Sequence, residues 1–499
     1  MSAYIIAIDQ STAGSKVLLF DTLAHVVATS TKQHEQYYPQ AGWVEHDVNE
    51  IYNNVLSCIR DVLDKAEVTS QSILGVTITN QRETAVMWDA ATGEPLCRAI
   101  VWQCQRTSEV CAALKAAGAE AMIKSKTGLM LDPYFSATKW QWMLQHVDAV
   151  STKLATGTLL AGTIDSWLLW KLSGGAIHAT DYSNASRTSL FNIHTLQWDE
   201  ELCELFKIPI NILPQVKCSD EIFGYTNSIE VLDDGIPITG IIGDSQAALF
   251  GNRCFVKGAA KATYGTGTSV LMNIGATKPI HSHNGVVEAI AWGQGGVVTY
   301  ALEAIIRSSG DSLSWVRDNL GLFTSFEEME ALIQEVDDNE GVYLVPAFVG
   351  LGAPYWQPEA RAAITGMNRR SNKSHIMLAA LESIAYQVCD AVELLQGSAQ
   401  LRITELRVDG GASRNNRLMQ FQADILRAKV IRTEVAELSA MGSYYMGGLA
   451  LGMWNSLEDI PPITQEFSFE PLMSKDRQER LYRGWKQAVL SVMAASSEA

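Results

Sequence analysis

Residues 4–16 read YIIAIDQSTAGSK, and this stretch decides the fold. Its apolar, β-branched first half predicts a buried strand that ends at one acid, Asp9. Small hydroxyl and glycine residues follow, which favour a tight turn before a second strand at Lys16–Asp21. Such a turn can present backbone N–H groups to an anion, beside a carboxylate that can bind a metal. An ordinary hairpin with an acid at the strand end explains the stretch equally well.

Two further glycine-rich turns occur in the second half of the chain. Residues 261–269 read KATYGTGTS, and residues 406–416 read LRVDGGASRNN, a strand that enters an Asp-Gly-Gly turn. Three such turns spread over both halves fit one nucleotide bound between two domains. The chain has no G-x-x-x-x-G-K-[ST] loop and neither the His-Arg-Asp nor the Asp-Phe-Gly signature of protein kinases.

Length and composition predict a globular protein of two or more domains. The chain has 499 residues, of which 47% are hydrophobic. Its formal net charge of -17 argues against nucleic acid as a partner. Asp9 interrupts the apolar N-terminus, and the uncharged stretch Met441–Trp454 is too short to span a bilayer. We therefore expect a cytoplasmic protein that does not insert into a membrane.

Polar residues follow two strands predicted in the first half. Arg82 and Glu83 come just after the strand Ile73–Thr79, where open α/β sheets place ligands. A guanidinium and a carboxylate together can grip vicinal hydroxyls, although an adjacent Arg-Glu pair is also a common surface ion pair. Trp102 follows residues 99–101 in the same way, either as the wall of a sugar site or as a core residue.

A second acid at a predicted strand end is Asp244. The strand Gly235–Ile242 leads into GDSQA at residues 243–247, which opens a helix of small residues. The segment nearly matches the G-x-S-x-G turn that carries the nucleophile of α/β-hydrolases. Ala247 replaces its last glycine, and no His-Gly-Gly oxyanion motif occurs, so the hydrolase interpretation is the weaker one.

The order of predicted elements repeats after a candidate boundary at residues 252–258. Each half opens with strand–turn–strand and continues in βα units. In the second half we expect helices at Ile305–Asn319 and Ser374–Leu395. The pattern predicts a duplicated α/β domain with a cleft between the copies.

These features together resemble the FGGY carbohydrate kinases, and among them the glycerol kinase-like branch. The likeness runs from Tyr4 to about Trp454, and it rests on the motifs DQST (9–12), GWVEHD (42–47), NQRET (80–84), IVWQC (100–104), YGTG (264–267), PAFVGLGAPYW (346–356) and VDGGA (408–412). The resemblance implies two RNase H-like domains of the actin/hexokinase type that close over ATP, Mg²⁺ and a sugar or polyol. We expect an N-terminal domain at residues 1–251, a nucleotide-binding domain at 258–455 and a helical extension at 456–499.

The resemblance also implies roles for individual residues. Asp244 matches the catalytic base, and Asp9 matches the Mg²⁺ anchor. The positions that match phosphate and nucleotide contacts are Thr12, Ala13, Lys16, Thr266, Gly310, Gly411 and Asn415. The family usually has Arg in place of Lys16, so this contact becomes a point charge rather than a fork. The positions that match polyol contacts are Arg82, Glu83, Trp102 and Tyr134.

Two expected pocket positions depart from glycerol kinase. Ser245 stands where that enzyme has Gln, and Ser269 stands where it has Phe. Both changes shrink side chains at the substrate, and the second adds a hydroxyl. We therefore expect ATP-dependent phosphorylation of a terminal hydroxyl of a short polyol or ketose longer than glycerol. Authentic glycerol kinase and a non-catalytic ATP-gated binding protein of the actin fold are the alternatives, and a homo-oligomeric dimer or tetramer is expected.

Several bacterial glycerol kinases, which this chain resembles, bind fructose 1,6-bisphosphate at a glycine- and arginine-bearing loop just before the strand that leads to the catalytic acid. The matching segment here is Asn227–Gly235, which has no Arg or Lys and three acids. Carboxylates repel a bisphosphate, so we expect no inhibition by this effector.

Overall fold

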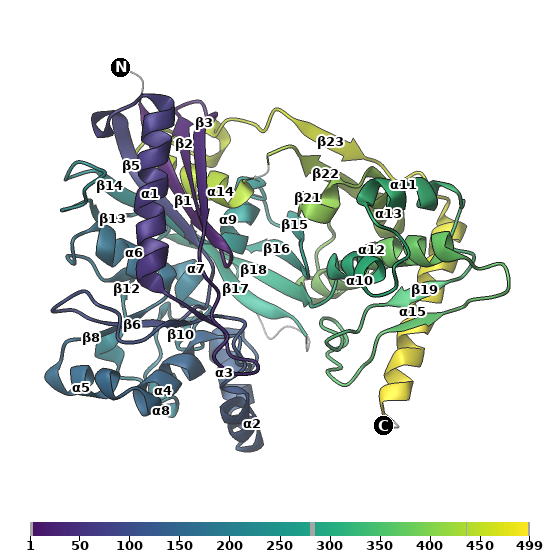
Figure 1. The fold of residues 1–499 in the computed structure, drawn as a ribbon, viewed down its shortest axis with the longest axis horizontal. Helices are drawn as coiled ribbons and strands as arrows, with labels where there is room; N and C mark the ends of the chain where they lie inside the picture. Colours follow the sequence, from purple (N-terminus) through teal and green to yellow (C-terminus); the bar gives the residue numbers. More distant parts are fainter. Residues whose placement is uncertain (1–2, 280–284, 436, 498–499) are drawn as a thin grey trace.

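A computed structural model describes residues 3–279, 285–435 and 437–497, and shows two halves that are each built on a mixed β-sheet (Figure 1). The strand order is β13-β14-β5-β1-β2-β3 in the N-terminal half and β17-β18-β16-β15-β21-β22-β23 in the C-terminal half. The α/β fold class with two sheet-containing halves is therefore confirmed. Among the described residues, no helix is long and apolar enough to cross a membrane.

The N-terminal sheet forms around β1, as the opening stretch predicts. Strand β1 is antiparallel to β2 and parallel to β5, and its side chains alternate between two buried faces. Ile6 and Ile8 face α1, whereas Ile5 and Ala7 belong to the cluster that contains α9 and α14. The strands are β1 (Tyr4–Gln10), β2 (Gly14–Asp21), β3 (Val26–Gln33), β5 (Ile73–Asn80), β13 (Ile222–Tyr225) and β14 (Pro237–Gly243).

Helix α1 (Val48–Ala66) covers one face of this sheet. Asp47 caps its N-terminus by accepting hydrogen bonds from two backbone N–H groups, and an apolar stripe that begins at Val48 faces the strands. The remaining elements of this half include α6 (Ile164–Leu172), which packs beside α1 on the same face; most of the others extend below the sheet (Figure 1). Besides α6, these elements are β4 (Glu45–His46), β6 (Val86–Asp89), β7 (Ala99–Ile100), α2 (Ser108–Ala116), α3 (Glu120–Thr127), α4 (Ser136–His146), α5 (Asp148–Thr156), β8 (Leu159–Gly162), β9 (Ala179–Asp181), α7 (Tyr182–Ala185), β10 (Phe191–Asn192), β11 (Gln197–Trp198), α8 (Glu200–Leu205) and β12 (Gln215–Lys217).

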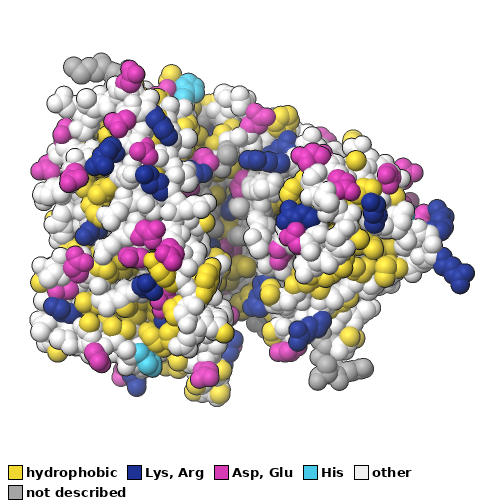
Figure 2. Space-filling model, in the orientation of Figure 1, with side chains coloured by type: hydrophobic (Ala, Val, Ile, Leu, Met, Phe, Trp, Pro, Cys, Tyr) yellow, Lys and Arg dark blue, Asp and Glu magenta, His cyan; other side chains and the backbone are white. Residues whose placement is uncertain are grey.

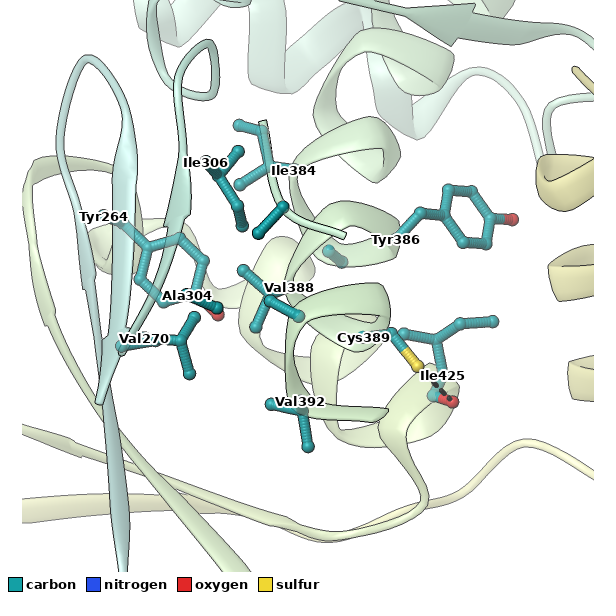
Figure 3. Close-up of a cluster of buried hydrophobic side chains, with 14 of the residues drawn as sticks. Tyr264, Val270, Ala304, Ile306, Ile384, Tyr386, Val388, Cys389, Val392 and Ile425 are labelled. Atoms are coloured by element: carbon teal, nitrogen blue, oxygen red, sulfur yellow. Dashed lines mark hydrogen bonds between the residues drawn. The ribbon is translucent and has the colours of Figure 1, made fainter. Parts of the chain in front are cut away.

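The C-terminal sheet repeats the pattern of the first. Its central strand β15 is antiparallel to β16 and parallel to β21, as β1 is to β2 and β5. Figure 3 shows Val270, Ala304 and Ile306 of this sheet packed against Ile384 and Val388 of α12. The strands are β15 (Ala260–Tyr264), β16 (Thr268–Gly275), β17 (Val287–Gln294), β18 (Val297–Ile306), β21 (Glu405–Gly410), β22 (Lys429–Thr433) and β23 (Glu466–Phe469); the other elements are α10 (Asp311–Asp318), α11 (Phe326–Gln334), β19 (Tyr343–Val345), β20 (Ala363–Thr365), α12 (Lys373–Ala399), α13 (Asn416–Leu426) and α15 (Lys475–Ser497).

Two helices of equivalent position join the halves. α9 (Asp244–Gly251) follows β14, α14 (Leu438–Ala450) follows β22, and the two pack against each other beside the N-terminal sheet. Glycines make this approach possible. A Cβ on Gly442 would collide with the carbonyl oxygen of Ala247, and one on Gly251 with that of Leu438. The small-residue character of both helices is therefore a packing requirement.

Two expectations from the sequence need correction. The helix predicted at Ile305–Asn319 begins only at Asp311, because β18 continues through Ile306 and Ile305 pairs with Ser269 of β16. The C-terminal extension is not helical throughout, since β23 pairs with β22 before α15 begins. The division into residues 1–251, 258–455 and 456–499 remains a proposal.

Candidate active site

The ends of neighbouring strands bring the predicted site residues of the N-terminal half together. Gln10 of β1 lies opposite Asn80 of β5, and Asn80 lies opposite Gly243 of β14. The turn after Asp9, the polar segment that begins at Asn80 and the acid Asp244 therefore leave the sheet at one edge. In the C-terminal half, Tyr264 lies opposite Gly410, so both glycine-rich turns leave from adjacent strands.

A cavity of about 230 Å³ lies between the two halves, where Figure 2 shows a groove across the surface. Its lining includes Asp9 and Asp244 from the N-terminal half, and Lys261, Asp409 and Glu437 from the C-terminal half. Ser245 also lines it. The cavity thus brings together both acids that the sequence singled out.

Charge in this cavity is set by Asp9 and its neighbours. Burial, together with the nearby carboxylates of Asp244 and Glu437, raises the pKa of Asp9 to about 7, while Lys16 opposes this shift. A divalent cation would relieve this crowding of acids, so the residues fit a Mg²⁺ site. No group of three His, Cys, Asp or Glu forms a ready metal cage within the described residues. A cation here would take its remaining ligands from phosphates and water.

Asp244 opens α9 and is anchored through one carboxylate oxygen. Its Oδ1 accepts a hydrogen bond of 2.6 Å from the Ser245 N–H and forms an ion pair of 3.2 Å with Arg82 Nε. Among the described residues, no hydrogen bond reaches Oδ2. The side chain is 37% exposed, which gives a substrate hydroxyl access to a carboxylate that is already oriented.

Arg82 and Glu83 are buried, so the surface ion pair considered from the sequence is wrong: their side chains are 5% and 1% exposed. Arg82 donates to Gln246 at 3.1 Å and to Glu303 at 3.2 Å. Arg187 donates to Glu83 at 2.6 Å and to Glu303 at 2.7 Å. Burial raises the pKa of Glu303, but Arg187 and Arg82 outweigh that effect and hold it at about 2. The pair belongs to a buried network of four charged groups.

Trp102 and Tyr134 form an aromatic wall next to the turn between β1 and β2. Their ring centroids lie 5.2 Å apart, and the Trp102 indole N–H donates to the Thr12 hydroxyl at 2.9 Å. The loop that carries Tyr134 is fixed by buried Lys139, whose ammonium binds the carbonyls of residues 133, 134 and 135. The indole bond links the predicted polyol wall directly to the predicted phosphate contact.

The remaining predicted phosphate contacts lie on the N-terminal side of the cleft. Ala13 follows Thr12 in the first turn, where its carbonyl oxygen accepts from the His34 N–H at 3.4 Å. Lys16 forms an ion pair of 2.7 Å with Glu437, which lies in the C-terminal half. Lys16 therefore has a protein partner at the position where the resemblance places a phosphate.

The predicted nucleotide contacts cluster in the C-terminal half. The Thr266 carbonyl accepts from the Ser309 N–H at 2.8 Å, and Gly310 donates to the Gly265 carbonyl at 3.0 Å, so two turns meet. Gly411 begins the turn after β21, and apart from its chain neighbours no atom in the described part of the chain lies within 4 Å of the place a Cβ would take. Asn415 caps α13 through its side-chain oxygen.

Comparison with known proteins decides the family. Residues 4–251 match the N-terminal domain, and residues 260–451 the C-terminal domain, of the FGGY family of carbohydrate kinases. The chain belongs to this family. It is 48% identical over 491 residues to a glycerol kinase of Xanthomonas campestris, a match that covers 98% of each chain.

Solved structures of FGGY kinases have the same fold. A Plasmodium falciparum glycerol kinase crystallised with ADP is similar with a TM-score of 0.93 and 36% identity, over 98% of each chain. A gluconate kinase of Lactobacillus acidophilus has a TM-score of 0.89 at 19% identity over 100% of each chain, which supports the fold alone. The actin/hexokinase-like fold is thus confirmed, as is the activity class: this FGGY protein is a carbohydrate kinase, a phosphotransferase.

Three charged groups of this candidate site were not singled out by the sequence analysis. Glu303 lies within β18 and Arg187 follows the short helix α7, so neither stands at a strand end or in a glycine-rich turn. Lys261 opens the segment 261–269 but lies within β15, before the turn itself. Lys261 is buried, lines the cavity and donates to Thr263 at 2.6 Å. A charged residue in an otherwise apolar strand is the only signal that could have identified Glu303 and Lys261.

Proposed function

We propose that this kinase transfers the terminal phosphoryl group of ATP to a terminal hydroxyl of a short polyol, and that glycerol is the first substrate to test. The named relatives at 48% and 36% identity are glycerol kinases, which favours glycerol over a sugar. One observation supports the chemistry most directly. Asp244 has one anchored carboxylate oxygen and a second that is available in the interdomain cavity.

The proposed step needs one general base from the protein, which otherwise positions the reactants and forms no covalent intermediate. The substrate hydroxyl gives its proton to Asp244 Oδ2 while its oxygen forms a bond to the terminal phosphorus. The bond between that phosphorus and the bridging oxygen breaks, and ADP leaves with the electron pair. Arg82 Nε, 3.2 Å from Asp244 Oδ1, holds the carboxylate in position for this transfer.

The nucleotide would lie across the cleft, with phosphates near Thr12, Ala13 and Lys16 and the nucleoside near Thr266, Gly310, Gly411 and Asn415. A Mg²⁺ ion anchored through Asp9 would neutralise phosphate charge. Lys261 is suited to the same task, because its buried ammonium faces the cavity. Closure of the two halves would exclude water and limit hydrolysis of ATP.

A longer polyol or a ketose is the second candidate, because Ser245 and Ser269 are smaller than the side chains that the resemblance expects. Ser245 lines the cavity, and Ser269 is partly exposed beside the buried network. Ser269 is paired across the strands with Ile305, an apolar residue that packs, like Tyr134, against the small cluster of Leu129, Phe135 and Val287. The small side chain of Ser269 is therefore not by itself evidence of room for a longer substrate.

A coupled assay of ADP release distinguishes these candidates. The purified kinase is assayed with ATP and Mg²⁺ against glycerol, four-carbon polyols and short ketoses. The highest kcat/KM with glycerol supports the first candidate, and a preference for a four-carbon substrate supports the second. ATP binding without turnover on any of them would instead favour a non-catalytic binding protein.

We also propose that the kinase works in the cytoplasm as a dimer or tetramer, without nucleic acid as a partner. Light scattering on the purified protein measures its mass directly. A mass equal to that of one chain would contradict the oligomer.

A further inference from the structure

The C-terminal half contributes one carboxylate to the predicted polyol grip. Glu303 lies in β18 and is 1% exposed on its side chain, whereas its two arginine partners belong to the N-terminal half. One oxygen, Oε2, accepts from Arg187 at 2.7 Å. The other, Oε1, accepts from Arg82 at 3.2 Å. Through Arg187, whose Nε donates to Glu83, the same carboxylate is connected to both predicted polyol contacts.

Ser269 donates to this network. Its hydroxyl lies 3.0 Å from Glu303 Oε1, the oxygen that also accepts from Arg82. The sheet explains the geometry, because Ser269 pairs with Ile305 on β18, and Glu303 is two residues earlier on the same face. Neither Phe nor Ala could make this hydrogen bond, since both lack a donor.

Arg82 has few donors left for a substrate. Of the five N–H groups of a guanidinium, one is bound by Gln246 and one by Glu303, while the Nε group faces Asp244. The two that remain must point correctly to meet a hydroxyl. The angle of the guanidinium plane is therefore set by its protein acceptors, and a hydroxyl that shares Glu303 Oε1 affects that angle.

We propose that Glu303 is a positioning residue for the polyol, and that Ser269 tunes substrate binding by donating a hydrogen bond to Glu303 rather than only by leaving space. The inference rests on the proposed polyol kinase function. Loss of the Ser269 donor lets the Glu303 carboxylate and the Arg82 guanidinium reorient, which weakens the grip on any polyol. If Ser269 acted only by leaving space, a larger side chain at this position would weaken the binding of long polyols and not that of glycerol.

Three substitutions separate hydrogen bonding from volume. Ser269→Ala removes the donor and keeps the space, Ser269→Thr keeps the donor and adds a methyl group, and Ser269→Phe removes both donor and space. We expect Ser269→Ala to raise KM about 2–10-fold for glycerol and for a four-carbon polyol alike, as loss of one hydrogen bond predicts. The KM for ATP stays unchanged, kcat changes less than KM, and Ser269→Thr remains within about 2-fold of the wild type.

A matched control is Ser30→Ala in β3. Ser30 also donates to a carboxylate, that of Asp61 at 2.7 Å, on the side of the N-terminal sheet that α1 covers. The Ser30→Ala substitution should leave the KM values for glycerol and for a four-carbon polyol unchanged. A Ser269→Ala enzyme with wild-type KM values, beside a Ser269→Thr enzyme that favours glycerol, would overturn the proposal and leave volume as the explanation.

A stability measurement keeps the proposal testable if no polyol is phosphorylated. Urea unfolding of wild type, Ser269→Ala, Glu303→Gln and the double variant forms a double-mutant cycle. We expect the double variant to be less destabilised than the sum of the two single changes, because Ser269→Ala removes the donor of the hydrogen bond that Glu303→Gln weakens by replacing its carboxylate acceptor with an amide. Additive effects would overturn the proposed contact between Ser269 and Glu303. Absence of polyol turnover with a non-additive cycle would instead reject the proposed function alone.

Discussion

The charged side chains of the cleft differ in how many of their hydrogen-bonding atoms already have a protein partner. Arg82 faces an acceptor from each of its three nitrogens, whereas the buried ammonium of Lys261 donates to Thr263 at the wall of the cavity. Asp244 keeps one oxygen without a hydrogen bond among the described residues. Atoms without a protein partner among the described residues, such as Asp244 Oδ2 and the two remaining N–H groups of Arg82, can meet a substrate, and the partnered atoms hold these side chains in position. This distinction separates the proposed base from the network that orients it.

The substitution Asp244→Asn tests the proposed base. The amide has nearly the same shape but cannot accept the hydroxyl proton, so we expect kcat to fall by about 10²–10⁴-fold. Binding of ATP, measured by its shift of the melting temperature, should change little because the proposed phosphate and nucleoside contacts do not include Asp244. Turnover at the wild-type rate would show that Asp244 is not the base.

A buried histidine makes stability depend on pH. Burial, together with the nearby His34, lowers the pKa of His46 to about 3; His46 lies between Gln36 and Gln81. The unfolded chain, with a histidine pKa near 6.5, binds more protons than the folded one between about pH 3 and 6.5. Stability therefore falls as pH falls through this window, by about 2 kcal/mol at pH 5 from this residue.

We expect His46→Gln to flatten the dependence of the unfolding free energy on pH below 6.5. Urea unfolding between pH 5 and 8 measures it. The control is Leu23→Gln, a change at an exposed residue of the β2–β3 turn that carries no titratable group, which should leave the slope as in the wild type. If the unfolding free energy of His46→Gln depended on pH as steeply as that of the wild type, His46 would not be the source of this pH dependence.

The contact between helices α9 and α14 explains why each of them carries a glycine, Gly251 and Gly442, that has no role in the proposed chemistry. Each helix follows a strand whose end lies at the cleft, and each presents glycine at its contact with the other. Asp244 begins one helix and Glu437 precedes the other, so the packing of these helices sets the distance between two acids of the cavity. The order of strands and turns predicted both halves well. It could not predict this contact, because no local pattern reports which helices meet.

The substitution Gly442→Ala tests the crossing. Its Cβ would collide with the backbone oxygen of Ala247, so the helices must separate, and we expect a loss of about 1–3 kcal/mol. Gly397 in α12 is a matched control, since outside its own stretch of helix no atom of the described residues lies within 4 Å of the place its Cβ would take. Gly397→Ala should stabilise the protein by up to about 1 kcal/mol. Equal effects of the two substitutions in thermal unfolding would contradict this account.

In the whole molecule, the duplicated halves explain why some site residues could be predicted and others could not. Asp9, Arg82 and Asp244 follow strands that end at one edge, and the alternation of strands and polar turns marks such positions. Glu303 enters the site from within a strand of the other half. Its role depends on how the two sheets face each other, which is a property of the assembled fold rather than of any segment.

The structure supports the expectation that a sugar bisphosphate does not regulate this kinase, through the hydrogen bonds and charges of the segment at residues 227–235. The segment Asn227–Gly235 uses its own donors: the Ser228 N–H binds the Asp234 carboxylate at 2.7 Å, and the Gly235 N–H binds the Thr226 carbonyl at 2.8 Å. The nearby Arg60 lies 3.4 Å from Glu230, an exposed pair. A bisphosphate would have to displace two carboxylates to reach these groups, at a cost in charge repulsion.

We therefore expect fructose 1,6-bisphosphate not to inhibit this kinase. The test is an activity titration with millimolar effector at saturating ATP and limiting polyol, with inorganic phosphate at equal ionic strength as the control for salt. Surface charges respond to ionic strength, so a small effect shared by both anions would be screening and not binding. Saturable inhibition by the bisphosphate alone, abolished by substitutions in residues 227–235, would show that an anion site forms there in spite of its acids.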